Sequence, residues 1–192
     1  MISPKRFRAS KSLDESLWLD VKRQGVSATD VAKASTDAGF REVLDLRKGD
    51  MKIEDNRYMQ FGRDQEPHVA MWLKDNLGIM PNDWVISHHE TPEYMATPDG
   101  LSMDHRFVAE IKTTGKDWDP NKIPIQYRRQ VQWQLYVTGA EYAVFAWLLR
   151  VERDGVFVPG WFEPKHTVID RDEEHIQQLK TVADNLLEAL NG

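Results

Sequence analysis

Hydrophobic periodicity and residues that start or stop helices predict six helices along the chain. In the first of them, Leu13, Leu17 and Val21 recur at four-residue spacing. Ser12 is placed to cap this helix. Such an apolar stripe is typical of a helix on the surface of a globular protein. The predicted helices cover residues 12–25, 27–35, 38–49, 61–78, 125–139 and 171–190.

Strand-like segments lie between the fourth and fifth helices and again before the last helix. They are rich in β-branched and aromatic residues and are bounded by turn residues such as Gly and Pro. The predicted strands cover residues 84–90, 93–100, 106–114, 141–152 and 155–164. This order of elements predicts an α/β (α+β) fold, in which helices flank a mixed central β-sheet.

The length of 192 residues suits one domain with a substantial core, so we expect residues 1–192 to form a single domain. The chain has no cysteine, which excludes disulfides, thiolate zinc sites and iron–sulfur clusters. No apolar run approaches the roughly 20 residues that cross a bilayer. The first residues lack the apolar stretch of a secretory signal, so we expect a cytoplasmic protein without membrane contacts.

The net charge of −6 is unevenly distributed along the chain. Residues 53–110 carry a net charge of −7, whereas residues 1–52 and 111–130 each carry +3. An acidic middle between two basic stretches fits a metal site flanked by surfaces that contact phosphates. The alternative, that charge clusters of this size are only solvated surface, stays open.

Glu110 and Lys112 are the first candidates for chemistry. Side chains two residues apart in a strand point the same way, so Glu110, Lys112 and Val108 share a face. Ile111 points to the opposite face. A carboxylate beside an ammonium is also a common structural ion pair, so this pair alone does not indicate a function.

Asp99 makes a functional role for Glu110 and Lys112 more plausible. The turn Pro98-Asp99-Gly100 ends one predicted strand, and residues 102–106 form a hairpin loop of suitable length before the next one. Antiparallel pairing would bring Asp99 beside Glu110. Two adjacent carboxylates repel unless a cation lies between them, and Mg²⁺ prefers such ligands. Alternatively, Asp99 only shapes a turn.

Glu66 is the third carboxylate of interest. It lies at helical spacing with Val69, Ala70 and Leu73, which places it on the apolar stripe of its predicted helix. A carboxylate that faces the core requires a partner or a metal. Because Pro67 disfavours helical geometry in the residue before it, Glu66 is alternatively the N-cap of the helix.

Two further pairs of polar residues are notable. Gln130 and Gln134 lie one helical turn apart among apolar neighbours, which suits either a polar site or a solvated helix face. His88 and His89 are adjacent, but a histidine pair without a spaced carboxylate motif is more typical of a surface than of a metal site.

Together these segments resemble the core of PD-(D/E)xK nucleases, and more narrowly the lambda-type phage exonuclease (viral recombinase) family. The resemblance begins at WLDVKRQGVSATDVA, residues 18–32, and continues through GRDQEP, ATPDGL and AEIKTT. It extends to YRRQVQWQLYVTG, residues 127–139, and closes with RDEEHIQQL in the last helix. Each block is weak alone, but the blocks occur in the family's order and span most of the chain.

The resemblance implies a restriction-endonuclease-like core that holds Mg²⁺, as one ion or two, with Mn²⁺ as a substitute. The implied metal ligands are Glu66, Asp99, Glu110 and the backbone carbonyl of Ile111. Lys112 would hold or activate the attacking water, and Gln130 would help to fix it. The residues leave open whether Lys112 is a base or a positive charge near the scissile phosphate.

The same resemblance implies that Lys22, Thr29 and Thr97 bind the 5′-terminal phosphate of one DNA strand. The family usually has Arg and Ser where this chain has Lys22 and Thr29, with Arg23 next door as a substitute. Ser27 and Thr29 also lie at a predicted helix start, where free N–H groups attract anions. Alternatively, Thr29 only caps the helix and Lys22 is solvated.

The implied function is Mg²⁺-dependent 5′→3′ exonuclease activity on linear double-stranded DNA, which leaves 3′ single-stranded tails for phage-type recombination. We expect residues 1–50 to form a helical part that binds the DNA end, and residues 51–192 to form the catalytic core and C-terminal helix. The resemblance also implies a ring-shaped homotrimer, a single-strand annealing protein as partner, and the cytoplasm of a bacterial host. Two alternatives stay open: an endonuclease of the same superfamily, and a catalytically silent scaffold that binds DNA ends.

Overall fold

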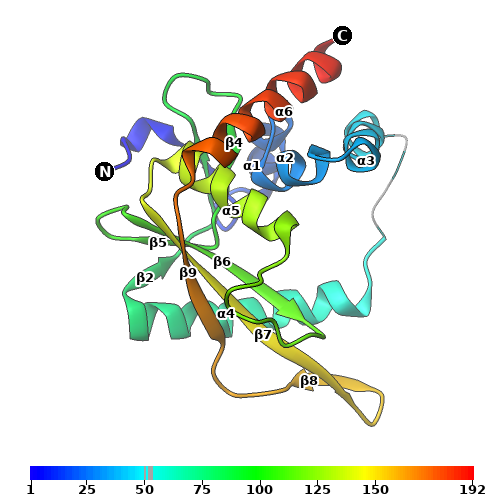
Figure 1. Ribbon diagram of the computed structural model, residues 1–192, viewed down its shortest axis with the longest axis vertical. Helices are drawn as coiled ribbons and strands as arrows, with labels where there is room; N and C mark the ends of the chain where they lie inside the picture. The colour runs from blue at the N-terminus through cyan, green and yellow to red at the C-terminus, as the bar shows by residue number, and fades with distance from the viewer. Residues whose placement is uncertain (50, 52–53) are drawn as a thin grey trace.

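The computed structural model describes residues 1–49, 51 and 54–192, and Figure 1 shows its arrangement of helices around a sheet. The helices are η1 (Pro4–Arg6), α1 (Glu15–Arg23), α2 (Ala28–Ala34), α3 (Asp37–Lys48), α4 (Arg57–Leu77), α5 (Ile125–Thr138) and α6 (Glu173–Asn191). The strands are β1 (Phe7–Ser10), β2 (Ile79–Pro81), β3 (Trp84–Ser87), β4 (Met95–Ala96), β5 (Gly100–Ser102), β6 (Phe107–Thr114), β7 (Tyr142–Arg153), β8 (Val156–Pro159) and β9 (Lys165–Asp170).

The predicted start of the first helix was wrong in its cap and its buried face. Asp14, not Ser12, caps α1 by accepting a hydrogen bond from the amide of Leu17. Only Val21 of the predicted stripe is buried, while Leu13 is 75% exposed and Leu17 is 50% exposed. The four-residue spacing therefore identified the helix but not the side on which it packs.

Helix α4 begins at Arg57, ahead of the predicted residue 61. Its start is set by Asn56, whose side chain accepts hydrogen bonds from the amides of Tyr58 and Met59. The helix continues through Pro67, so the alternative that Glu66 is its N-cap is wrong. Proline removes one backbone donor without ending a helix when the surrounding packing holds it.

Three strands, β1, β2 and β9, lie wholly outside the predicted strands, and β5 shares only Gly100 with the predicted segment 93–100. Strand β9 pairs antiparallel with the first half of β7, from Tyr142 opposite Asp170 to Trp147 opposite Lys165. Of its residues only Ile169 is buried, so its sequence lacks the apolar alternation that identifies a strand. Strand β4 is also shorter than the predicted segment 93–100, because the chain leaves the sheet at Thr97.

The main sheet has the order β2-β5-β6-β7-β8, with β9 also paired to β7. Strands β6 and β7 are parallel, from Phe107 opposite Tyr142 to Thr114 opposite Leu149, and α5 is the crossover between them. The other pairings of this sheet are antiparallel, and β1, β3 and β4 form a separate three-stranded sheet. The predicted α/β (α+β) class with a mixed central sheet flanked by helices is confirmed.

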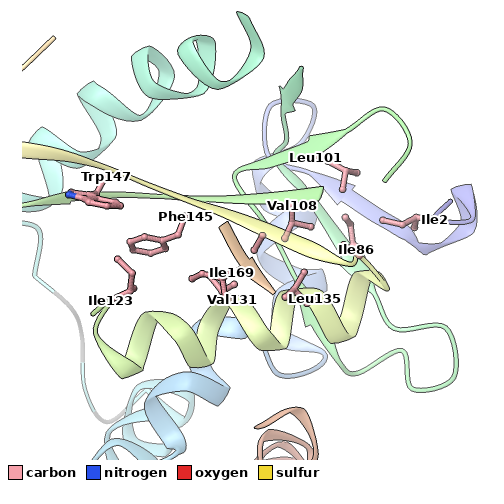
Figure 2. Close-up of a cluster of buried hydrophobic side chains, with 12 residues drawn as sticks. Ile2, Ile86, Leu101, Val108, Ile123, Val131, Leu135, Phe145, Trp147 and Ile169 are labelled. Atoms are coloured by element: carbon pink, nitrogen blue, oxygen red, sulfur yellow. The ribbon is translucent and has the colours of Figure 1, made fainter. Parts of the chain in front are cut away.

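The core lies on both faces of the β6–β7 pair, as the alternation of side chains along strands requires. On one face, Val131 and Leu135 of α5 pack with Val108 of β6, and Figure 2 shows this cluster between the helix and the strands. On the opposite face, α4 covers the alternate strand positions (Figure 1). The buried residues of this second face include Val69, Leu73, Ala109, Ile111, Val144, Ala146 and Leu148.

Helices α2, α3 and α6 pack on the outer side of α5 around Trp133, whose indole donates a hydrogen bond to the carbonyl of Met95. The expected boundary between residues 50 and 51 lies next to residues 50 and 52–53, which are outside the described residues. In the part of the chain that the structure describes, no helix has the length and hydrophobicity needed to span a bilayer.

His88 is buried, so the expectation that both histidines lie on the surface was wrong for this residue. Its ring stacks on Tyr136 of α5 with a centroid separation of 4.5 Å. Its Nδ1 accepts hydrogen bonds from the amides of Glu90 and Thr91, both at 3.4 Å. Burial, reinforced by His89 and Arg6, lowers the pKa of His88 to about 4.

This environment predicts a specific loss of stability in acid. An unfolded histidine binds a proton below about pH 6.5. Folded His88 binds one only below about pH 4, so between these pH values protonation favours the unfolded state. We expect the wild-type protein to lose about 2 kcal/mol more stability than His88→Asn between these pH values, measured by urea unfolding. Asparagine keeps an acceptor for the two amides without titrating. His68→Asn is the control, because His68 is exposed and lies outside this cluster, so it should follow the wild type. Equal pH profiles for the wild type and His88→Asn would contradict the assignment.

Candidate active site

Glu110 is the most enclosed carboxylate of the predicted set, with 2% of its surface exposed. It lies in the middle of β6, on the face that α5 covers. Its Oε1 accepts hydrogen bonds from the Lys112 ammonium and from Gln130 Nε2, the latter at 2.6 Å. Its Oε2 accepts a hydrogen bond from Gln134 Nε2 at 2.5 Å. A buried carboxylate is tolerated only with such donors. The glutamines of α5 therefore provide the hydrogen bonds that Glu110 of β6 requires.

The two glutamines reach Glu110 because they lie one turn apart on the same side of α5. The structure thus places both of them at the site, although sequence reasoning assigned a role only to Gln130. The four-residue spacing from Gln130 was the one sequence signal for Gln134. Its carboxylate partner, Glu110, is distant in sequence and gives no local signal. Gln134 is fully buried, and its Oε1 has no hydrogen-bond partner among the described residues.

Lys112 follows Glu110 on the same face, as the strand period predicted. Burial opposes its positive charge, but the negative Glu110 and Asp99 outweigh this effect and raise the pKa of Lys112 above its ordinary value. Its ammonium also lies 5.5 Å from the ring centroid of Tyr127. In this arrangement Lys112 holds its proton at neutral pH.

Asp99 lies beside β6, just before β5 pairs with that strand. Its amide donates to the carbonyl of Ala109, and its Oδ2 accepts from the amide of Ile111 at 2.7 Å. The side chain of Asp99 therefore takes the place of a backbone acceptor for the amide of Ile111, beyond the end of the β5–β6 pairing. Next to it, a Cβ on Gly100 would lie 2.8 Å from Ile79 Cγ2 and 3.1 Å from Ala109 Cβ, so only glycine fits here.

The charge of Asp99 is unfavourable in this position. Burial, followed by the repulsion of Glu110, raises the pKa of Asp99 well above its ordinary value. The nearby Lys112 and the amide of Ile111 act in the opposite direction but do not compensate. This is the behaviour of a carboxylate packed against another carboxylate without enough positive charge between them.

Glu66 reaches the same region from α4, on the opposite face of the sheet. Its side chain is exposed, so the prediction that it lies on the buried stripe of its helix was wrong. It instead lines a cavity together with Ile111 and Lys112. Partial desolvation, followed by the negative charge of Glu110, raises the pKa of Glu66.

The donor set fits a divalent cation in charge, although its side chains are not gathered around one point. Among the described residues, no three His, Asp, Glu or Cys side chains lie close enough together to form a metal cluster. Yet Glu66 and Asp99 both have raised pKa values, because burial desolvates them and because the negative charge of Glu110 is near. Hard divalent cations such as Mg²⁺ take one or two carboxylates and complete their shell with water and phosphate oxygens.

Two cavities meet at Lys112. The larger, of about 650 Å³, lies between α2, α3 and α5, and its wall includes Thr29, Lys33, Arg129 and Gln130. The smaller, of about 360 Å³, lies beside α4 and contains Glu66. Lys112 is thus accessible from both sides of the candidate site.

The predicted 5′-phosphate residues come from α1, from α2 and from the segment that follows β4. Lys22 is half-buried and its ammonium lies 4.2 Å from the ring centroid of Trp18, so the alternative that it is solvated was wrong. Burial lowers the pKa of Lys22, against the attraction of Asp30. Arg23 is exposed and pairs with Asp20 at 2.8 Å.

Thr29 and Thr97 lie on different segments. Thr29 is exposed in the first turn of α2 and lines the larger cavity, whereas Thr97 is half-buried between β4 and Asp99. Among the residues that the structure describes, no hydrogen bond or ion pair joins these two threonines to Lys22.

The helix-start argument for an anion site fails at α2. Ser27 does cap this helix, as predicted, and the alternative that Thr29 is the cap was wrong. The capping box is closed by Asp30, whose carboxylate accepts from the amide and hydroxyl of Ser27. A negative side chain already occupies the start of this short helix, so its free N–H groups do not support phosphate binding.

Comparison with solved structures gives the same fold. A crystal structure of an alkaline exonuclease, LHK-Exo, from Laribacter hongkongensis matches with a TM-score of 0.71 and 25% sequence identity, over 92% of each chain. A crystal structure of LHK-Exo in complex with dAMP matches with a TM-score of 0.71 and 24% identity, again over 92% of each chain. A phage related exonuclease from Haemophilus somnus 129PT matches with a TM-score of 0.67 and 13% identity, over 86% of this chain and 93% of the other. The predicted PD-(D/E)xK-type fold is confirmed.

No curated protein sequence matches the chain. The family model for the YqaJ-like viral recombinase domain matches residues 17–141, which is about two-thirds of the chain. These residues include all three carboxylates, Lys112 and both glutamines of the candidate site. The chain therefore belongs to the YqaJ-like viral recombinase family, as the resemblance to lambda-type phage exonucleases predicted.

Proposed function

We propose that the protein is a Mg²⁺-dependent 5′→3′ exonuclease that degrades linear double-stranded DNA from a 5′-phosphorylated end. Its product would be a duplex with 3′ single-stranded tails for recombination by strand annealing. Family membership and the similar exonuclease structures support a phage-type exonuclease. The metal, the polarity and the product are parts of the proposal.

The observation that carries the proposal is the set of Asp99, Glu110 and Lys112 around the middle of β6. Two carboxylates there are held together against their repulsion, and a lysine lies beside them on the same face. Phosphodiester hydrolysis requires a cation at the phosphoryl oxygens and a nucleophile formed at neutral pH. A divalent ion supplies both when it is bound.

In this proposal Asp99, Glu110, Glu66 and the Ile111 carbonyl hold one or two Mg²⁺ ions, or Mn²⁺ in their place. Gln130 and Gln134 orient Glu110 through its two oxygens. The raised pKa of Lys112 supports a role as a fixed positive charge beside the scissile phosphate, rather than as a base.

The 5′-phosphate site is proposed on the family resemblance, with Lys22, Thr29 and Thr97 as its residues. Lys22 brings a positive charge with restricted motion, because its ammonium lies over the ring of Trp18. Arg23 is a weaker candidate, since Asp20 already pairs with it. We further propose a single nuclease domain over residues 1–192, with the DNA-end-binding part within residues 1–50.

The remaining elements of the proposal concern assembly and setting. They are a homotrimeric ring around the DNA, cooperation with a single-strand annealing protein, and action in the cytoplasm of a bacterial host. The alternatives are an endonuclease with the same core and a scaffold that binds DNA ends without cutting. The experiments below separate them.

The direct test uses a linear duplex with a 5′-phosphate on one strand and a 5′-hydroxyl on the other. With Mg²⁺, we expect the phosphorylated strand to shorten from its 5′ end, while a closed circle stays intact and EDTA stops the reaction. Cutting of the circle would favour the endonuclease. Binding of ends without cleavage would favour the scaffold.

In the same assay, Lys112→Met should reduce the rate about 10²–10³-fold, because a charge at the transferring phosphoryl group is lost.

Asp99→Asn should separate charge repulsion from folding. The raised pKa of Asp99 means that its ionised form destabilises the folded state at pH values above that pKa, and protonation relieves this as the pH falls. Asparagine keeps an oxygen for the Ile111 amide without the charge. We therefore expect the free energy of unfolding in EDTA at neutral pH to rise by about 1 kcal/mol, with loss of nuclease activity.

A metal titration of the same pair provides the control. Mg²⁺ should raise the melting temperature of the wild type and have little effect on Asp99→Asn, because binding to the folded state alone stabilises it. An equal rise in both proteins would place the metal elsewhere. A less stable Asp99→Asn protein would contradict the repulsion.

Lys22→Ala should lower the preference for a 5′-phosphate over a 5′-hydroxyl about tenfold, which is the loss of one charge-assisted contact. Arg23→Ala should have a smaller effect on this ratio. Lys180→Ala is the matched control, because Lys180 also lies over an aromatic ring, that of Tyr136, but belongs to α6. An unchanged ratio in Lys22→Ala would remove this residue from the phosphate site.

A further inference from the structure

The smaller cavity beside Lys112 has one wall that the proposed reaction does not use. Glu66, Ile111 and Lys112 form the side that belongs to the candidate active site. Tyr58, from the first turn of α4, and Arg150, from β7, contribute to the rest of the lining. The cavity therefore adjoins the position of a bound scissile phosphate.

Arg150 is held by aromatic rings. Its guanidinium lies 4.5 Å from the ring centroid of Tyr58 and 5.0 Å from that of Phe157. No carboxylate among the described residues lies within ion-pair distance of it. The other two arginines of this region differ, since Arg57 pairs with Glu152 at 3.0 Å and Arg63 pairs with Asp55 at 2.5 Å. The charge of Arg150 is thus fixed in place but not neutralised.

Tyr58 adds a flat surface to this charge. Its side chain is 53% exposed, although its ring lies only 5.1 Å from that of Phe157. The Asn56 cap fixes the backbone of this turn, because its side chain accepts hydrogen bonds from the amide of Tyr58 and the next amide. A rigid, partly exposed ring next to a guanidinium suits a nucleotide, with the base on the ring and the phosphate on the arginine.

We propose that Arg150 and Tyr58 form a subsite for one nucleotide of the strand that is cut, next to the scissile phosphate. This inference rests on the proposed nuclease function and deepens it. Arg150 binds the backbone phosphate of that nucleotide, and Tyr58 stacks on its base. The subsite positions the strand and takes no part in the chemistry.

The test measures the affinity of a fluorescent single-stranded oligodeoxythymidylate in EDTA, where no cleavage occurs. Arg150→Gln should weaken binding about tenfold and reduce the slope of affinity against salt by about one phosphate contact. Tyr58→Leu should weaken binding about tenfold with an unchanged salt slope, whereas Tyr58→Phe should bind like the wild type. On linear duplex, both weakened variants should raise KM more than they lower kcat.

Arg57→Gln is the matched control, because Arg57 lies 3.8 Å from the ring centroid of Phe157 but is paired with Glu152 and does not line the cavity. It should bind the oligonucleotide like the wild type. Arg150→Lys keeps the charge and should retain most of the binding, which covers the case that Arg150→Gln fails to fold. Wild-type affinity and salt slope in Arg150→Gln would overturn the subsite, whether or not the protein cuts DNA. If the wild type binds the oligonucleotide through Arg150 but degrades no DNA, the subsite stands and the proposed exonuclease function fails.

Discussion

Glu110 imposes the main physical constraint on this fold. A carboxylate with 2% of its surface exposed is costly in the middle of a sheet unless several donors surround it. The donors come from two places: Lys112 on the same strand, and Gln130 and Gln134 on the crossover helix. The parallel pairing of β6 with β7 is what lays α5 across this face, so the topology and the polar network depend on each other.

The same strand also keeps negative charges closer together than stability alone favours. The carboxylate of Asp99 bonds to the amide of Ile111, and Gly100 allows β5 to pack closely beside β6. Burial raises the pKa values of Asp99 and Glu66, and the repulsion of Glu110 adds to this effect. Sites that bind cations commonly have this property, because the ion provides the missing positive charge. Two cavities meet at Lys112, beside this position.

The parts of the site that follow a local period could be predicted from the sequence. The two-residue alternation placed Glu110 and Lys112 on one face, and the hairpin length placed Asp99 beside β6. Capping chemistry identified the start of α2 correctly. These features depend on neighbours within a few residues, or on one antiparallel pairing.

The features that were missed depend on distant neighbours. Helical spacing placed Glu66 on a buried stripe, but this side chain is exposed in a cavity wall, one turn before the buried Val69 and Ala70. Strand β9 is an edge strand whose exposed positions show no apolar alternation. The rings around Arg150 come from α4 and from the β7–β8 hairpin, so no local motif marks them. Lys22 is an exception, because its aromatic partner Trp18 lies on the preceding turn of α1, but spacing alone does not distinguish packing from exposure.

The central claim is that Asp99 and Glu110 hold a divalent cation at the point of phosphodiester cleavage. Anomalous diffraction from crystals grown with Mn²⁺ and a 5′-phosphorylated DNA end measures this most directly. The account predicts an anomalous peak within coordination distance of both carboxylates and of the Ile111 carbonyl, next to a phosphate oxygen of the DNA. A peak elsewhere in the protein, or none at this position with the DNA end bound, would contradict it.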